Sequence, residues 1–190
     1  MKRFLDIVLV IGFAPLWLPL AAVTALMVAL VLGRPVFFLD PRAGKGGKPF
    51  RLIKFRSMRT GPGSDAERLT RFGRFLRASS LDELPEMWNI LAGDMSLVGP
   101  RPLPVRYLPR YTPEQAHRHD VRPGLTGWAQ VHGRNALDWE TKFRYDLEYV
   151  RNRSLALDAK ILAMTVVQVL FPRHVNHAGE ATMSEFKGGR

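Results

Sequence analysis

Two adjacent carboxylates, Asp82 and Glu83, stand in the stretch "SSLDELPEMWNIL" (79–91). The apolar spacing after them predicts a helix from Asp82 to Leu91, and Pro85 places its start near Leu81–Asp82, because proline fits only the first helical turn. One interpretation is structural: first-turn acids interact favourably with the helix dipole, and Ser80 and Glu83 have the spacing of a capping box.

The other interpretation is chemical. A helix start keeps a nearby carboxylate ionised, so that it is available as a nucleophile or as a ligand for a hard cation such as Mg²⁺. Adjacent helical side chains point about 100° apart, so Asp82 and Glu83 are expected to have different tasks. The residues alone do not decide which acid would attack.

Arginines flank this acidic pair. Arg77 precedes it, and Arg101 follows it between two prolines in "GPRP". A proline-stiffened arginine is a good fixed clamp for a phosphoryl group, because its planar guanidinium matches two phosphate oxygens. The combination points to phosphoryl chemistry.

The composition supports an anionic partner. The 190 residues include 28 Lys and Arg against 17 Asp and Glu, a net charge of +11. Such a balance predicts binding of nucleic acid, acidic lipid headgroups or a phosphorylated substrate, without choosing among them. The absence of cysteine excludes disulfides, cysteine–zinc sites and thiol catalysis.

Residues 5–32 form an almost wholly apolar run. As one helix it would be roughly 42 Å long, more than the hydrocarbon core of a bilayer. Pro15 and Pro19 fall near its middle, where proline bends a helix. Basic residues flank both ends, and residues 33–77 hold 12 Lys or Arg against 3 Asp or Glu, a net charge of +9.

Because positive flanks prefer the cytoplasm, both ends of this run favour the same side of a membrane. A helix that enters and leaves one leaflet, broken at Pro15, satisfies that preference. A proline-kinked spanning helix is the alternative that stays open.

The elements that must position the acids are short. Val36–Phe38 and Phe50–Phe55 are predicted strands joined by the glycine-rich turn "AGKGGKP", and 58–67 is predicted to be a loop. Arginines recur every third residue from Arg68 to Arg77, which on a helix gives a basic face suited to lipid headgroups. Helices are also predicted for 112–119, 138–152 and 158–171, with a strand-like centre in 120–135.

Four motifs together resemble the bacterial sugar transferase family, the monotopic phosphoglycosyl transferases. They are "KFRSM" (54–58), "SSLDELPEMWNILAGDMSLVGPRPL" (79–103), "RHDVRPGLTGWAQVHGRN" (118–135) and "LDAKIL" (157–162). The similarity covers residues 2–171. The chain resembles the minimal form of the family, which has a catalytic domain and one membrane segment.

The resemblance implies an α+β, mostly helical fold. It implies an N-terminal re-entrant helix-break-helix (1–33), then a small β-hairpin in a compact helical catalytic domain with interfacial amphipathic helices (34–171), and a polar C-terminal tail (172–190). It places the protein in the bacterial cytoplasmic membrane, with the active site on the cytoplasmic face.

The implied reaction moves a sugar-1-phosphate from a UDP-sugar to a polyprenyl phosphate, normally undecaprenyl phosphate, and releases UMP. It begins the assembly of a surface glycan. The resemblance assigns Asp82 as the nucleophile that forms a phosphosugar-aspartyl intermediate, Glu83 as a ligand of Mg²⁺, and Arg101 as a phosphate contact.

Further cations are candidates for phosphate or substrate contact: Arg77, Lys54 and Arg56 of "KFR", and Arg122 of "VRPG". A surface or structural charge is the alternative for each of the last three. Asp146 and Asp158 are candidates for orienting these cations, with a structural salt bridge as the alternative.

The sequence departs from the family pattern at three places. Ala14-Pro15 stands where Ser-Pro is often found, Glu86 where glutamine is common, and His132 where asparagine is common. The last two bear on sugar or nucleotide preference.

Two other classes compete with the enzyme. A membrane-tethered nucleic-acid-binding module would explain the charge but not an acidic pair beside "GPRP", so no nucleic acid is expected. A scaffold without chemistry is the second rival. A homodimer at the membrane stays open, as does the identity of the sugar.

Overall fold

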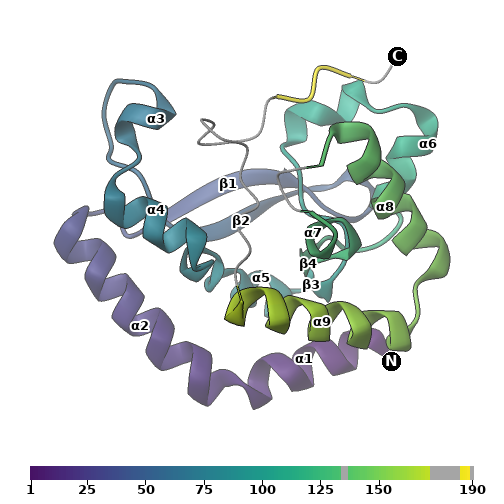
Figure 1. Ribbon diagram of the computed structural model, residues 1–190, viewed down its shortest axis with the longest axis horizontal. Helices are drawn as coiled ribbons and strands as arrows, with labels where there is room; N and C mark the ends of the chain where they lie inside the picture. The colour runs from purple at the N-terminus through teal and green to yellow at the C-terminus, as the bar shows by residue number, and fades with distance from the viewer. Residues whose placement is uncertain (134–136, 172–184, 189–190) are drawn as a thin grey trace. The chain divides into compact units, whose positions relative to one another are not determined.

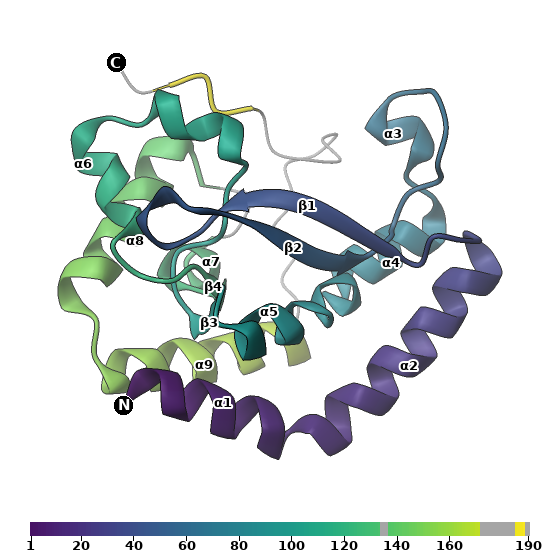
Figure 2. The same ribbon diagram turned by 180° about the vertical axis from the view of Figure 1, so that it is seen from behind.

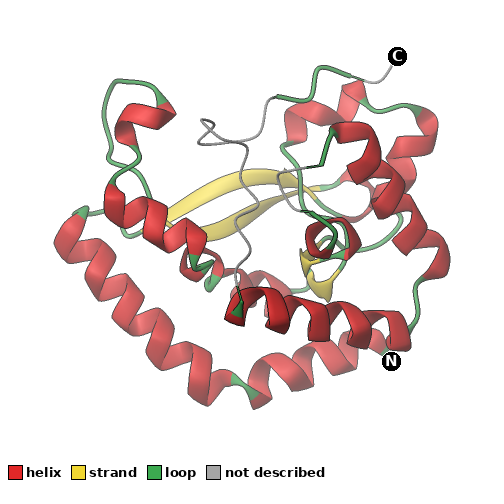
Figure 3. Ribbon diagram, viewed as in Figure 1, coloured by secondary structure: helices red, strands yellow, loops and turns green. Residues whose placement is uncertain are grey.

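The computed structural model describes residues 1–133, 137–171 and 185–188. The described chain is mostly helical with a small antiparallel β-hairpin, as predicted (Figure 3). It divides into two compact units: Arg3–Asp40 with Arg51–Ala92, and Pro41–Phe50 with Gly93–Arg190, Met1 going with the first and Lys2 with the second. Each unit is described by itself below.

The first unit begins with two consecutive helices, α1 (Lys2–Gly12) and α2 (Ala14–Val31), which change direction at Phe13 (Figures 1 and 2). The break was predicted at Pro15. It lies two residues earlier, which is within one helical turn of the predicted position. Pro15 occupies the first turn of α2, where its missing N–H costs no helical hydrogen bond. Pro19 lies inside α2 without ending it.

Trp17 holds the break together. Its indole Nε1 donates to the carbonyl oxygen of Val10 at 2.9 Å, which satisfies one of the carbonyls left open at the end of α1. The same ring meets Trp88 edge to face, with centroids 5.5 Å apart. The buried Trp17 side chain thus fixes the angle between α1 and α2 through the hydrogen bond of its indole N–H and the packing of its ring.

Helix α2 leaves most of its apolar surface uncovered. It is the one helix among the described residues that is long and apolar enough to cross a membrane, with a mean hydropathy of 2.1, and only 17% of it is buried. Leu16, Leu26 and Leu30 are 69%, 59% and 77% exposed. Contiguous exposed apolar surface of this kind marks an interaction with lipid or protein, which fits a membrane-associated protein.

The hairpin consists of β1 (Phe37–Ala43) and β2 (Pro49–Phe55). A short turn, η1 (Lys45–Gly47), joins them, and its Gly46 and Gly47 have φ angles of 64° and 72° that favour glycine. The prediction of two strands around "AGKGGKP" is confirmed, although β1 extends further than expected.

The helix predicted from Arg68 to Arg77 is wrong as a single element. The structure has α3 (Asp65–Arg68), inside the predicted loop, and α4 (Arg71–Ala78). Between them Leu69 is extended, and the Thr70 side chain accepts from the amide of Gly73 as a new N-cap. The periodic arginines are therefore divided between two helices.

Gly73 lets α4 approach the chain that follows β2. A Cβ atom at this position would lie 1.8 Å from the carbonyl oxygen of Ser57, so only glycine fits. On the same helix Leu76 joins Val28 of α2 and Phe55 of β2 in a fully buried cluster. This cluster is the core of the first unit.

The second unit is built around a short parallel pair, β3 (Ser96–Val98) and β4 (Gly124–Thr126), in which Ser96 pairs with Gly124 and Val98 with Thr126. The strand-like centre of 120–135 is confirmed by β4, whereas β3 was not predicted. Besides η1, the helices described in this unit are η3 (Val105–Arg110), α6 (Pro113–Ala116), η4 (His117–His119), α7 (Trp128–Val131), α8 (Trp139–Asn152) and α9 (Leu155–Leu170).

Side-chain caps fix where several of these helices begin. Thr112 forms a capping box with Gln115 at α6, and Asp138 caps α8. Ser154 caps α9, which therefore begins three residues earlier than expected. The unit's main core consists of Val98, Val131, Tyr149 and Ile161.

Most of the predicted C-terminal tail, 172–184 and 189–190, lies outside the described residues.

Candidate functional site

The acidic pair lies in a strained turn. Ser80 adopts a left-handed conformation, with φ of 57° and no capping contact from its side chain, so the predicted capping box with Glu83 is wrong. Asp82 and Glu83 lie in a 3₁₀ turn, η2 (Leu81–Glu83). Unfavourable backbone conformations of this kind cluster at functional sites.

The α-helix starts later than predicted, as α5 (Glu86–Ala92). An α-helix from Leu81 would need Pro85 to donate an N–H to the carbonyl of Leu81, and proline has none. The amide of Leu84 takes that carbonyl instead, at 3.3 Å, in a tighter turn. Asp82 is consequently presented by a turn and is 8% exposed.

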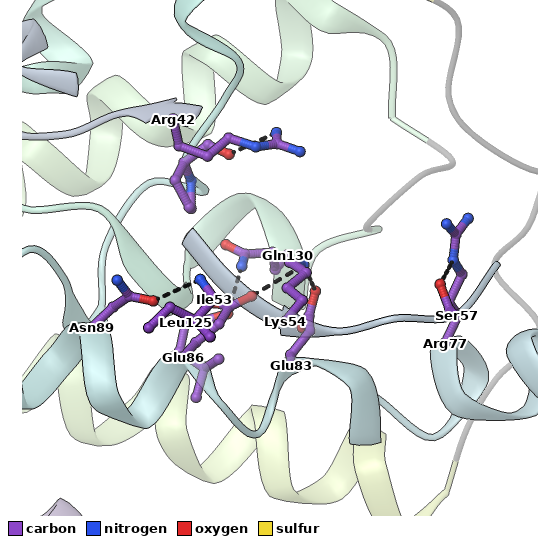
Figure 4. A network of polar contacts seen from close by, with 11 residues as sticks. Arg42, Ile53, Lys54, Ser57, Arg77, Glu83, Glu86, Asn89, Leu125 and Gln130 are labelled. Atoms are coloured by element: carbon purple, nitrogen blue, oxygen red, sulfur yellow. Dashed lines mark hydrogen bonds and ion pairs between the residues drawn. The ribbon is translucent and has the colours of Figure 1, made fainter. Parts of the chain in front are cut away.

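Lys54 of β2 joins two carboxylates. Its Nζ lies 2.8 Å from Glu83 Oε1 and 3.0 Å from Glu86 Oε1 (Figure 4). The Lys54 and Glu83 side chains are 15% and 18% exposed, and Glu86 is only 4% exposed. One ammonium therefore offsets the repulsion between two acids that flank Pro85.

Asn89 fixes the distance between α5 and β2. Its Oδ1 accepts from the amide of Ile53 at 3.0 Å (Figure 4). Its Nδ2 donates to the carbonyl of Arg51 at 2.8 Å. The amide of Asn89 thus binds a backbone N–H and a backbone C=O of β2, as a neighbouring strand would. This contact places Lys54 of β2 opposite Glu83 and Glu86. Asn89 was not among the predicted site residues, and its place in the "PEMWNIL" motif is the one sequence signal that pointed to it.

Arg3 of α1 secures the other end of α5 by donating to the carbonyls of Ile90 and Leu91. Cations interact favourably with a helix C-terminus. The helix that carries Glu86 is thereby tied to the N-terminal segment.

Two predicted phosphate contacts of this unit have structural partners. Arg77 Nε donates to Ser57 Oγ at 3.0 Å (Figure 4), and the buried Arg56 donates to the carbonyls of Leu32 and Gly33 at the end of α2. These contacts place Arg56 as a cap of the apolar helix. Phosphate binding by either arginine stays a prediction.

In the second unit Arg101 lies on a loop held by close backbone contacts. A Cβ at Gly124 would lie 2.0 Å from the amide nitrogen of Gly99, and a Cβ at Gly127 would lie 2.2 Å from its carbonyl oxygen. The glycines of "VGPRP" and "PGLTGW" therefore let two chains pack directly. The Arg101 side chain itself is exposed.

Asp146 pairs with a residue that the sequence analysis missed. Arg118 Nε and Nη2 lie 3.0 Å and 2.7 Å from Asp146 Oδ2, and Nη2 also donates to the carbonyl of Arg101 at 2.8 Å. Burial opposes the charge of Arg118, but Asp146 and Tyr111 together outweigh burial and raise the pKa of the guanidinium. The buried pair holds the backbone of the Arg101 loop in place.

Asp158 and Arg122 also have structural partners. Asp158 pairs with Lys2 and accepts from Tyr149 Oη at 2.7 Å, so the structural salt bridge left open in the sequence is present. Arg122 is exposed and donates to the carbonyl of Gly93 at 2.8 Å. Contact of these residues with substrate stays a prediction.

Two titratable side chains of the second unit, His119 and Lys142, have lowered pKa values. Burial, reinforced by Arg118, lowers the pKa of His119 to about 4, so this ring is neutral at physiological pH. Burial, reinforced by Arg101, lowers the pKa of Lys142 to about 8. Arg101 and Lys142 therefore repel each other, which an anion between them would relieve.

No cluster of three or more His, Asp or Glu side chains arranged to hold a metal is found in the described residues. The carboxylates of Asp82 and Glu83 nevertheless fit Mg²⁺, which prefers oxygen ligands and commonly uses only one or two carboxylates besides substrate phosphates and water.

The bridge made by Lys54 yields a prediction. Lys54→Met should lower the free energy of unfolding by about 3 kcal/mol, because it leaves two carboxylates facing each other at low exposure. Adding Glu86→Gln should restore at least about 1 kcal/mol. Chemical denaturation of the wild type, both single variants and the double variant in detergent measures these values and their additivity. Independent, additive effects would contradict the bridge.

Comparison with known proteins gives the family. The model of the family described as bacterial sugar transferase matches residues 1–172. The chain is 47% identical over 194 residues to "Uncharacterized sugar transferase EpsL" of Bacillus subtilis (strain 168), covering 99% of this chain and 96% of that protein.

Two longer relatives carry descriptive names. The UDP-glucose:undecaprenyl-phosphate glucose-1-phosphate transferase of Xanthomonas campestris pv. campestris is 43% identical, over 86% of this chain. The UDP-N-acetylgalactosamine-undecaprenyl-phosphate N-acetylgalactosaminephosphotransferase of Aeromonas hydrophila is 40% identical, over 89% of it. The chain spans only 37% and 43% of the lengths of these two relatives.

The matching model and the near full-length similarity to EpsL confirm the resemblance inferred from the four motifs: this chain belongs to the bacterial sugar transferase family of enzymes.

Proposed function

We propose that this chain transfers a sugar-1-phosphate from a UDP-sugar to undecaprenyl phosphate or a related polyprenyl phosphate, with release of UMP. The observation that carries the proposal is the nearly buried Asp82, presented by a strained turn beside the Lys54–Glu83–Glu86 bridge. The names of two relatives, which describe this class of reaction with glucose and with N-acetylgalactosamine, support it.

The proposed reaction has two steps. A carboxylate oxygen of Asp82 forms a bond to the β-phosphorus, the bond from this phosphorus to the oxygen bridging to the α-phosphorus breaks, and UMP leaves. A phosphate oxygen of the polyprenyl phosphate then attacks the same phosphorus, and Asp82 regains its carboxylate. Covalent catalysis replaces one direct reaction between a soluble and a lipid substrate with two separate steps.

Cations offset the charge on the transferring group. Mg²⁺, when bound through Glu83, would supply a positive charge next to the phosphoryl oxygens. Arg77 and Arg101 are proposed to bind phosphate oxygens, with Lys54, Arg56 and Arg122 as further contacts. Lys54 also keeps Glu83 in place, which its two short ion pairs support.

The N-terminal segment is proposed to be re-entrant and to hold the site at the headgroup plane. The break at Phe13, the exposed apolar surface of α2 and the basic residues on both flanks support this topology. Residues 34–171 would then form the catalytic domain on the cytoplasmic face of the bacterial inner membrane, with the arginines of α4 against anionic headgroups.

The product would be a polyprenyl diphosphate sugar, the first intermediate in the assembly of a capsule, exopolysaccharide, O-antigen or glycoprotein glycan.

The nucleophile is tested by Asp82→Asn. We expect UMP release from UDP-sugars, assayed with polyprenyl phosphate and Mg²⁺, to fall at least about 10³-fold, because an amide cannot form the intermediate. Asp65→Asn, the same change at an exposed acid of α3, should leave the rate unchanged. An unchanged thermal denaturation midpoint would exclude misfolding. Near wild-type turnover of Asp82→Asn would rule out the assignment.

The topology is tested with single cysteines, which the cysteine-free chain allows without background. One cysteine is inserted after Met1, and another replaces the exposed Arg34. Both should react with a membrane-impermeant maleimide from the cytoplasmic side, whereas Phe13→Cys at the break should be protected. Labelling of the first two sites from opposite sides would establish a spanning helix instead.

A further inference from the structure

An aromatic box in the second unit is filled by the chain's own C-terminal segment. Tyr107, Tyr111, Trp139 and Phe143, from η3 and α8 and the short link after η3, surround Phe186, which is 3% exposed. The ring centroids of these residues lie 5.0–5.7 Å from that of Phe186. Such edge-to-face and stacked contacts add to the burial of the ring.

Polar contacts hold Glu185, which precedes this ring, and the backbone of Phe186 itself. Arg110 and Arg106 lie 2.9 Å and 3.3 Å from the carboxylate of Glu185. Arg110 also donates to the carbonyl of Phe186, and the amide of Phe186 donates to Tyr107 Oη at 3.3 Å. Both arginines lie over the ring of Tyr107, 5.3 Å and 5.4 Å from its centroid.

We propose that the aromatic box and its arginine rim form a peptide-binding site for an acidic–aromatic pair, and that Glu185–Gly188 occupies it in cis as a clasp that positions Arg101. The family model ends at residue 172, so the clasp lies outside the part of the chain that defines the family. Its composition, read as a polar tail, gave no sign of a buried anchor.

The contacts connect the clasp to the Arg101 loop. Tyr111 and Phe143, which touch Phe186, also carry the Arg118 guanidinium over their rings, at 5.9 Å and 5.7 Å. Arg118 in turn donates to the carbonyl of Arg101. Loss of the Phe186 ring would loosen the rings that confine Arg118, and with them the backbone of the loop.

The seat of the clasp is tested by a disulfide. A Cβ at Gly188 would lie 3.9 Å from Arg110 Cβ, within the range of disulfides, so Arg110→Cys/Gly188→Cys should form an intrachain bond under mild oxidation. The positive φ of Gly188 disfavours a side chain, but the bond needs only transient closure. No other cysteine competes.

Non-reducing electrophoresis separates the outcomes. A monomeric, faster-running species supports the cis clasp. Disulfide-linked dimers formed on mixing the Arg110→Cys and Gly188→Cys single variants, with no intrachain product in the double variant, would overturn it in favour of exchange between copies. Absence of any disulfide would also overturn it.

Hydrogen exchange on the full chain tests the mechanical consequence. Phe186→Ala should speed amide exchange in 99–111 and 139–149 about tenfold, because these backbones lose their common support. Glu185→Gln, which keeps the ring, should have a smaller effect in the same segments. Lys187→Ala, an exposed neighbour, is the matched control and should change nothing. Equal exchange in all three variants would refute the clasp.

The role in positioning Arg101 rests on the proposed function and has its own readout. Phe186→Ala should raise the KM for the UDP-sugar about tenfold and change kcat by less than about twofold, because phosphate binding and not the nucleophile is disturbed. Unchanged KM together with faster exchange would remove the positioning role. A wild-type chain without UMP release would refute the proposed function, while the disulfide and exchange results would still decide whether the clasp exists.

Discussion

The ammonium of Lys54 is the constraint on which the arrangement of the acidic turn depends. Glu83 and Glu86 lie on opposite sides of Pro85 and would repel each other at low exposure without the cation between them. The position of Lys54 is in turn determined by Asn89, whose amide binds the backbone on both sides of Leu52. Side-chain contacts thus fix the position of β2 relative to α5. The turn that carries Asp82 is fixed as a consequence.

The second unit uses a different means to fix its cations. Glycines at 99, 124 and 127 let backbone pack on backbone, which gives the Arg101 loop little freedom. The buried Arg118–Asp146 pair then holds the carbonyl of Arg101, leaving its side chain exposed. A fixed backbone under an exposed guanidinium suits a phosphate contact, since less freedom is lost when the anion binds.

Local signals predicted a good part of the fold. The hairpin followed from its glycine-rich turn, α6 from Thr112 and Pro113, and the break in the apolar segment from Pro15, all of which act over a few residues. The helix predicted for 68–77 was wrong because Thr70 caps a new helix there, and the helix start near Asp82 was wrong because Pro85 permits only a tighter turn. In both cases the helical period of the sequence was given more weight than a single residue, Thr70 or Pro85, that ends or delays the α-helix.

The site could be predicted less completely. Arg101 was a candidate from its place between two prolines, whereas Asp82 was assigned as the nucleophile from the family motifs, since physics alone did not separate Asp82 from Glu83. The ion pairs around these residues join distant parts of the chain: Lys54 is 29 residues from Glu83, and Arg118 is 28 residues from Asp146. No sequence period reports such pairs, and the docking of Phe186 had no signal in a segment that reads as polar.

The most direct test of the central claim is to trap the covalent intermediate. The purified protein is incubated with a UDP-sugar labelled in the sugar, without polyprenyl phosphate, then denatured and digested. We expect label on the peptide that contains Asp82, with release of one UMP per label, and loss of the label to lipid when polyprenyl phosphate is added before denaturation. UMP release that requires the lipid and leaves no label on the protein would contradict it, as would label on a different residue.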